Sequence, residues 1–360
     1  MTGKTKYILT MILAMVIVDS AAQNSQVLYY MNLPQNHLMN PAMHPTNSFY
    51  IGLPVISGIN VNINNNFVNF SDIFSKSATS DSVFSFLSSD SGTDEFLSKV
   101  NKKNSISPQI TIPALSFGFS SGKGLYFFFD INERAEANAV LPGDIIKLML
   151  KGNAAFVGDK INLASLRMDM RYFREFGLTV SKDITEKLQA GIRPKLFTGI
   201  MATSLQNRSL GITVTEDYTH IFDADFSANL SGPFDVYSEN GQNIDSIVFD
   251  DSWFDTRTIL GTKNMGLGLD IGATYKLLNN LMISAALTDI GYIRWKRDVT
   301  NLTAKGEFIF EGFDMTDVIN GTKEFNDVGK ELLDSLKDSF NMVITNDPFT
   351  TWLAPGLTLG

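Results

Sequence analysis

The sequence lacks cysteine altogether and holds only three histidines among its 360 residues. The absence of cysteine excludes disulfide bonds, thiolate metal sites and a lipid-modified cysteine after an export signal. The histidines, His37, His44 and His220, have neither the spacing of a metal site nor the setting of a Ser-His-Asp arrangement. We therefore expect no metal, no cofactor and no catalytic residue, and we do not expect an enzyme.

Long apolar runs are equally scarce. Residues 7–18 form a short apolar stretch behind Lys4 and Lys6, and residues 20–22 are Ser-Ala-Ala. This order of positive charge, apolar core and small residues is typical of an export signal, which we assign to residues 1–22. No run of about 18 apolar residues follows it, so the sequence predicts no membrane-spanning helix.

Positive charge is also in short supply. The chain has 29 Lys and Arg against 38 Asp and Glu, a net charge of −9. Such an acidic balance argues against nucleic acid as a partner, because a phosphate backbone attracts basic surfaces.

What the chain has in abundance is alternation of apolar with small or polar residues, from about residue 50 almost to the end. Two successive side chains of a strand point to opposite sides, so residues 188–200 predict two distinct faces. One face carries Leu188, Ala190, Ile192, Pro194, Leu196 and Ile200, and the other carries Gln189, Gly191, Arg193, Lys195 and Gly199. Apolar residues outside and polar residues inside are typical of an antiparallel transmembrane β-barrel.

A soluble β-sandwich is the alternative reading of this alternation. A sandwich needs a charged outer face, whereas the second face here consists mostly of Gly, Ser, Thr, Ala and isolated charges. Aromatic residues gather near expected strand ends, as in the girdles of membrane barrels. We therefore favour an all-β fold, a transmembrane barrel of about 14 strands when complete, at roughly ten residues per strand.

The barrel is expected to occupy residues 49–360, with insertions at 64–104 and 314–342 that contain amphipathic helices. Its first strand is expected at 50–63, and a helix at 144–151. Residues 23–48, with three prolines, predict an irregular plug or hatch segment. The sequence ends on Thr-Leu-Gly rather than on a terminal aromatic residue. We therefore expect C-terminal strands to be missing.

Charged residues on the small-residue faces are candidates for the barrel lumen. The alternation places them opposite apolar residues of the same strands, where they would set the polarity of a passage or pair with one another. These lumen-facing candidates are Arg167, Asp169, Arg171, Arg193, Lys195 and Asp270.

The motif Asn40-Pro41-Ala42 resembles the hatch motif of the long-chain fatty-acid transporter barrels and of the type IX secretion shuttle protein. Residues 266–276 and the Asp-x-Gly of Asp289-Ile290-Gly291 look like the same superfamily. Taken whole, the chain is most similar to an uncharacterised family of Bacteroidetes outer-membrane barrels. The resemblance implies that Asn40, Pro41 and Ala42 are hatch residues that move to admit a hydrophobic ligand.

Two functions remain open at this point. The first is an outer-membrane channel or transporter for small hydrophobic ligands, gated by the hatch and surrounded by outer-membrane lipid. The second is a non-transporting barrel that serves as a secretion or envelope-assembly partner, with another envelope protein docking on residues 314–342. A membrane enzyme, testable by a lipase assay, is the third and weakest reading.

Overall fold

The structure, a computed structural model, describes residues 33–54, 57–76, 83–232, 234–237, 246–249, 264–278, 280–311, 320, 335 and 339–360. The predicted export signal and most of the helical insertion at 314–342 lie outside these residues. Within the described ranges, no helix is both long and apolar enough to cross a membrane.

The fold is built on one sheet of 14 strands whose pairs are antiparallel. Its longest strand, β9 (Leu188–Val214), has 27 residues. The other strands are β1 (Phe49–Gly52), β2 (Asn60–Asn65), β5 (Lys103–Gly122), β6 (Leu125–Pro142), β7 (Lys160–Asn162), β8 (Arg167–Asp183), β10 (His220–Ser231), β13 (Met265–Leu278), β14 (Leu281–Trp295), β15 (Val299–Phe310), β16 (Phe340–Thr345), β17 (Phe349–Trp352) and β18 (Gly356–Leu359).

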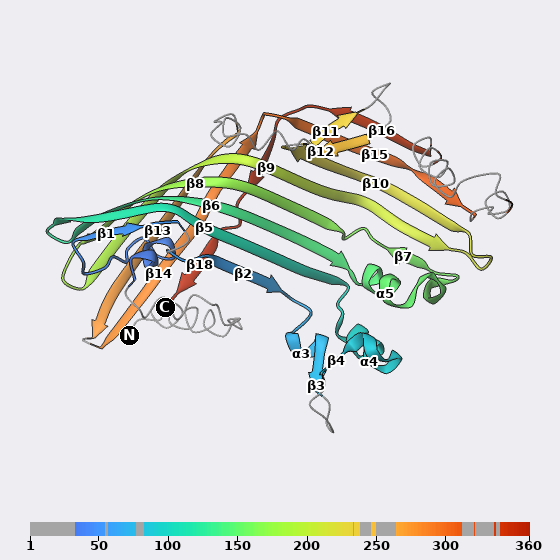
Figure 1. Ribbon diagram of the computed structural model, residues 1–360, viewed down its shortest axis with the longest axis horizontal. Helices are drawn as coiled ribbons and strands as arrows, with labels where there is room; N and C mark the ends of the chain where they lie inside the picture. The colour runs from blue at the N-terminus through green and yellow to red at the C-terminus, as the bar shows by residue number, and fades with distance from the viewer. Residues whose placement is uncertain are drawn as a thin grey trace, which may run out of the picture.

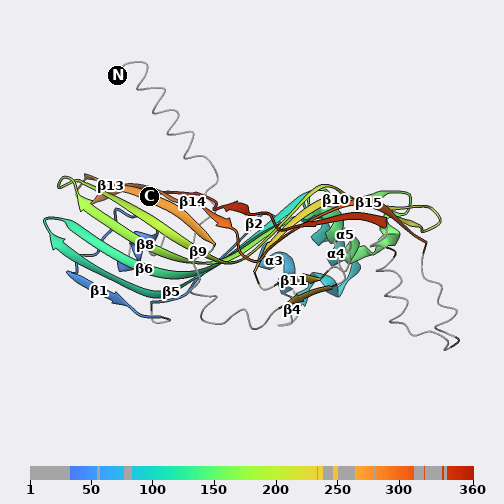
Figure 2. The ribbon, with the colours of Figure 1, turned by 90° about the horizontal axis from the view of Figure 1, so that it is seen from above.

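The sheet divides along β9, because this strand has two successive partners on one side. Residues 188–198 pair with β13, and residues 202–214 pair with β10. We call the first part, with β1, β13, β14, β17, β18 and the adjoining parts of β5, β6, β8 and β9, the curled half. The remainder, with β2, β7, β10, β15 and β16, is the extended half. The curled half wraps around the blue N-terminal segment, whereas the extended half is flatter (Figures 1 and 2).

The sheet is open among the described residues. In the curled half β1 pairs with β5 and β18 pairs with β14, and no further strand pairing is present at either edge. The expected class, an antiparallel β-sheet, is confirmed, and the sheet has 14 strands among the described residues. The closed barrel is not confirmed.

The strand register gives the sheet two consistent faces. Phe117, Phe129 and Leu178 lie side by side across three strands on what we call the apolar face. Asp130, Gly177, Lys195 and Gly268 lie side by side on the opposite, polar face. The alternation read from the sequence is therefore correct for most of each strand.

Bulges change the faces at defined points. Tyr172 pairs with Met201 and Phe173 with Gly199, so Ile200 is an extra residue in β9. A bulge turns the residues beyond it to the other side, and Ile200 is buried on the polar face. Its predicted place beside Ile192 was wrong.

Two other expectations need correction. The single strand expected at 50–63 is two short strands, β1 and β2, that pair with different parts of β5. In the first insertion, residues 83–85 form strand β4 (Val83–Ser85), paired with β3 (Phe74–Lys76), rather than part of a helix.

The rest of the first insertion follows the sequence. It contains α3 (Phe70–Ile73), the short 3-10 turn η2 (Phe86–Ser88) and α4 (Asp90–Lys99). Ser89 caps α4 by accepting a hydrogen bond from the amide of Gly92. Helix α5 (Gly143–Lys151) ends at Lys151, as expected, and η3 (Asn153–Phe156) follows after Gly152. A small hairpin, β11 (Phe234–Tyr237) with β12 (Ser246–Phe249), lies off the main sheet.

Candidate functional site: the hatch segment and the charged cluster

The hatch segment is described from residue 33. It begins with η1 (Pro34–Leu38), and Pro34 suits the first helical position because its missing N–H has no helical partner there. The turn continues through hydrogen bonds from the amides of Met39 and Asn40 to the carbonyl of Asn36. This compact unit lies inside the curled half (Figure 2). Asn36, His37, Asn40 and Ala42 are buried there.

Asn40 joins the hatch segment to the edge of the sheet. Its Nδ2 donates to the carbonyls of Ala273 in β13 and Ala285 in β14, at 3.4 and 3.5 Å. Its Oδ1 accepts a 3.0 Å hydrogen bond from the amide of Ala42, which closes a local turn. One amide side chain therefore shapes the hatch segment and contacts two strands.

Glycines on the polar face let the hatch segment approach the backbone of the sheet. A Cβ built on Gly191 would overlap the carbonyl group of Pro41, and one on Gly272 would overlap the Oδ1 of Asn40. Ser181 donates a 2.7 Å hydrogen bond to the carbonyl of Ala42. Only a small residue fits at such a close approach. The three residues predicted as a hatch all contact this face.

Two histidines pack against β6 and its neighbours. The ring of His37 stacks on Phe128 with 4.0 Å between centroids, and its Nε2 lies 3.4 Å from Oδ2 of Asp130. His44 Nε2 lies 3.2 Å from Oδ1 of Asp183, beside Tyr126. These contacts connect the hatch segment to the charged groups below it.

Beneath the hatch segment, nine charged side chains from five strands form what we call the charged cluster. They are Asp130, Arg134 and Glu136 of β6, Arg171 and Glu175 of β8, Arg193 and Lys195 of β9, Asp270 of β13 and Asp289 of β14.

Arg193 is the centre of the cluster. Its guanidinium donates to Asp130, to Oε1 of Glu175 at 2.6 Å and to Oδ2 of Asp270 at 3.0 Å. The arginine side chain is only 2% exposed. Lys195 lies 2.6 Å from Oδ1 of Asp270. Buried charges are tolerated only when paired and hydrogen-bonded, so each member depends on the others.

Asp289 reaches the cluster because of a bulge. Leu269 pairs with Ile290 and Ile271 with Leu287, which leaves one extra residue in β14. Asp289 adopts a φ of +59°, and its amide donates to Oδ1 of Asp270 at 2.7 Å. Its carboxylate accepts two hydrogen bonds from Arg134, at 2.8 and 2.9 Å. A non-glycine residue at positive φ is costly, and the paired charges offset that cost.

An apolar layer fills the next level of the interior. Phe173, Phe197, Ile293 and Trp295 are fully buried there, together with Leu353. Lys195 lies 5.9 Å from the ring centre of Phe197 and Arg134 lies 5.2 Å from that of Phe173. The polar face of the curled half is therefore covered in sequence by the hatch segment, the charged cluster and this apolar layer.

Comparison with known families identifies the chain. A family model described as a family of unknown function, DUF5723, matches residues 41–360. The chain belongs to DUF5723. The match spans the sheet and begins within the hatch motif, at Pro41. Comparisons with curated proteins and with solved structures give no match. The likeness of this DUF5723 chain to fatty-acid transporter barrels stays a prediction.

The predicted lumen residues of this DUF5723 chain fall into two groups. Arg193, Lys195 and Asp270 lie in the charged cluster, and Arg171 joins its margin through a 2.7 Å hydrogen bond to Glu136. Arg167 is exposed, and Asp169 accepts a hydrogen bond from Ser204 at 2.6 Å, away from the cluster.

Sequence reasoning missed most of the acidic members. Asp130 and Glu175 alternate with apolar residues just as Arg193 does, so the same signal was available for both. Asp289 was noticed only as part of an Asp-x-Gly motif. Asp289 points inward because of the bulge in β14, and the Asp-x-Gly motif does not predict that bulge.

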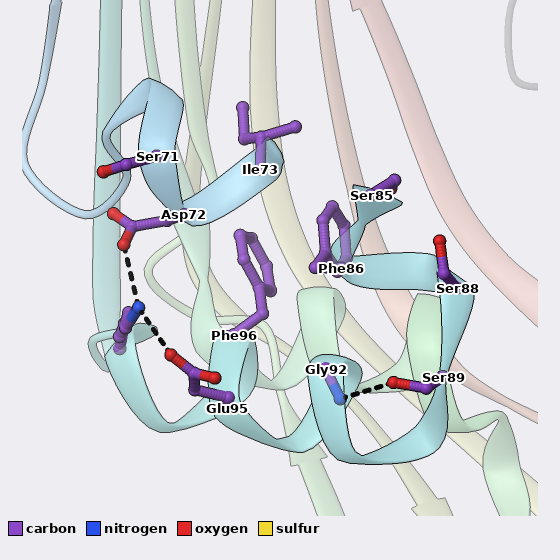
Figure 3. A pocket seen from close by; sticks show the side chains of 11 residues that line it. Ser71, Asp72, Ile73, Ser85, Phe86, Ser88, Ser89, Gly92, Glu95 and Phe96 are labelled. Carbon is purple, nitrogen blue, oxygen red and sulfur yellow. Dashed lines mark hydrogen bonds and ion pairs between the residues drawn. The ribbon is translucent and has the colours of Figure 1, made fainter. Parts of the chain in front are cut away.

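A separate pocket lies in the first insertion, between α3, η2 and α4 (Figure 3). Its volume is about 350 Å³, and the stacked rings of Phe86 and Phe96 form its apolar wall. Lys99 donates to Asp72 at 2.8 Å and to Glu95 at 3.2 Å. The hydrogen bond from Lys99 lowers the pKa of Asp72. These contacts hold the insertion together at the surface.

Proposed function

We propose that this DUF5723 protein is an outer-membrane protein whose hatch segment gates the passage of a small hydrophobic ligand. The observation that carries the proposal is the fit between the Asn40-Pro41-Ala42 turn and the glycines at 191 and 272. The turn seals the polar face of the curled half without belonging to the sheet. The hatch segment can therefore be displaced while the strand pairing of the sheet is retained.

The bonding of the hatch segment supports release. It contacts the sheet through isolated hydrogen bonds, such as those of Asn40 and Ser181, rather than through a strand ladder. Among the described residues, several buried polar atoms at this level have no hydrogen-bond partner: Gln35 Oε1, Asn36 Oδ1, Tyr126 OH and Thr179 Oγ1. Unsatisfied buried groups cost about 1–3 kcal/mol each, so the sealed arrangement is held less firmly than the sheet.

The chemistry of the two faces supports a membrane setting. Large apolar side chains of the curled half are exposed, among them Phe119, Leu178, Ile192, Leu267 and Ile271. Water is a poor solvent for such a continuous surface, whereas acyl chains are a good one. The acidic chain and its predicted export signal agree with the cell envelope.

The test introduces a side chain at a glycine that the hatch segment contacts. In Gly191→Ala the new methyl group overlaps the Pro41 carbonyl, so we expect the hatch segment to be displaced. Proteoliposome swelling with small solutes, or single-channel conductance, should then increase over the unmodified protein. Gly211→Ala is the matched control in the extended half, because the atom nearest its Cβ is the flexible end of Lys160. Equal flux through all three proteins contradicts gating by the hatch segment.

A non-transporting assembly partner is the second candidate, and one observation favours it. The charged cluster and the apolar layer behind the hatch segment fill the polar face of the curled half with mutually dependent contacts. Under this reading Gly191→Ala changes the protease sensitivity of residues 34–43 but gives no flux. Co-purification of an envelope protein that is lost when 314–342 is deleted would support it, with the predicted docking element at those residues.

A further inference from the structure

We propose that only the curled half of the sheet lies in the lipid bilayer, and that the extended half projects from the membrane into water. This inference rests on the proposed outer-membrane location and says which surface meets lipid. Burial changes along one continuous face of the sheet, between the curled half and the extended half.

In the curled half the apolar face is exposed. The register continues it across β8, β9 and β13, where Val180 pairs with Ile192 and Ile192 with Ile271. Ile192 is 46% exposed, and on the same face Ile290 of β14 and Leu357 of β18 are exposed as well. The opposite, polar face is the buried one, as Arg193 and Asp270 show.

Over β10, β15 and the far end of β9 in the extended half, the burial of the two faces is reversed. Register connects the apolar face to Ala304 and Phe308 of β15, and both are buried. The residues between and beyond them, Lys305 and Ile309, point to the polar side and are exposed. At the far end of β9, Val214 is buried under Phe156 of η3 and Leu148 of α5. Here the protein itself covers the apolar face, as a protein in water does.

Charges mark where the change occurs. On the apolar face Arg174 of β8 pairs with Glu133 of β6 through a 2.5 Å hydrogen bond, and Arg294 of β14 is exposed at the same level. The ring of Tyr292 packs against Trp352, which is 71% exposed, at 5.4 Å. Charged residues and amphipathic aromatic rings are typical of the boundary between acyl chains and headgroups.

The opposite boundary lies at the turns of the curled half. Lys123, Lys182, Lys187 and Lys276 lie at or beside the turns β5–β6, β8–β9 and β13–β14. Between the two boundaries run residues 174–182 of β8 and 265–276 of β13. At about 3.3 Å per residue and a tilt of about 40°, these segments span roughly 20–30 Å. This height brackets the apolar band of about 25 Å typical of outer-membrane strands.

The absence of cysteine makes the test direct, because each single-cysteine variant accepts one spin label. The variants are Leu178→Cys and Ile271→Cys in the curled half, and Ile309→Cys and Val343→Cys in the extended half. All four side chains are exposed to a similar degree, so burial does not separate them. The labelled protein is reconstituted into phospholipid vesicles, and collision with oxygen is compared with collision with a water-soluble nickel complex.

We expect oxygen to dominate at residues 178 and 271 and the nickel complex to dominate at 309 and 343. Labels at 309 or 343 that prefer oxygen as strongly as those at 178 and 271 would overturn this inference and leave the membrane location standing. Labels at 178 and 271 that prefer the nickel complex would overturn the outer-membrane proposal itself. Two positions in each half keep the result interpretable if one variant fails to fold.

Discussion

Ionic groups behave differently in the two halves of this molecule, although the same strands run through both. In the curled half Arg193 is 2% exposed and contacts three carboxylates. In the extended half Lys305 is 79% exposed and lies 3.7 Å from Asp225. The first arrangement is a buried network in which each charge is stabilised by the others. The second is a surface ion pair that contributes little to stability.

The difference shows that alternation along a strand does not determine whether each of its faces contacts protein or solvent. Alternation assigns side chains to two faces, and it does so equally well in both halves. What covers each face decides whether a charge is structural or merely solvated. In the curled half the hatch segment and the apolar layer cover the polar face, whereas α5 and η3 cover part of the apolar face in the extended half.

The largest expected effect comes from breaking the buried network. Arg193→Met leaves Asp130, Glu175 and Asp270 without their shared cation, so we expect a loss of about 3–5 kcal/mol in the free energy of unfolding. Lys305→Met, the matched change in the extended half, should cost less than about 1 kcal/mol. Urea titration in detergent micelles measures both. Similar losses in the two variants would mean that the two halves do not differ in this respect.

The second prediction concerns lipid. Ile192 and Ile309 are similarly exposed, at 46% and 53%, but lie in different halves. Ile192→Lys should reduce the free energy of unfolding in a bilayer by about 2–4 kcal/mol, because a lysine is poorly solvated by acyl chains. The free energy of unfolding of Ile309→Lys should lie within about 0.5 kcal/mol of that of the unmodified protein. Unfolding in phospholipid vesicles compares them, and a costly change at 309 would place both halves in lipid.

A smaller effect is expected at the hatch segment. Asn40→Ala removes the hydrogen bond to the Ala42 amide and two contacts with strand carbonyls, at a cost of about 1–2 kcal/mol. Hydrogen exchange of residues 34–43 should accelerate by roughly tenfold, while the sheet amides keep their rates. Asn62→Ala, on the edge strand β2, is the control. Faster exchange throughout the sheet would contradict an independently opening hatch segment.

The smallest expected effect is a pH dependence in the extended half. A hydrogen bond from Lys160 lowers the pKa of Asp223 below its usual value of 3.8. The resulting stabilisation is complete above that value and is lost as the pH falls through the lower, folded-state pKa. Lys160→Met should therefore reduce stability slightly at neutral pH and make no difference in strong acid. Thermal unfolding at the two pH values measures the change, and an effect that persists in acid would point to packing instead.

Much of the fold could be predicted from the sequence because strand alternation is a local property. Residues 188–200 predicted a strand with two distinct faces, and β9 contains all of them. Arg193, Lys195 and Asp270 were placed opposite apolar neighbours and do share a buried face. The hatch motif predicted a turn, and Asn40 closes one.

The remaining features depend on pairing between distant residues. Ile200 changes face only because β9 carries one residue more than β8 at that point. Asp289 turns inward for a similar reason in β14. Asp130 and Arg193 are 63 residues apart, and alternation says nothing about which charges will meet. Bulges and cross-strand neighbours are set by the register of the whole sheet.

Alternation along the strands was enough to assign the all-β class, since a period of two sorts side chains onto two faces without reference to any partner. Which face is covered in each half, and which charges form the cluster, could not be assigned in this way. Burial and ion pairing are relations between segments far apart in the chain, and these relations exist only once the strands have paired and the hatch segment has docked.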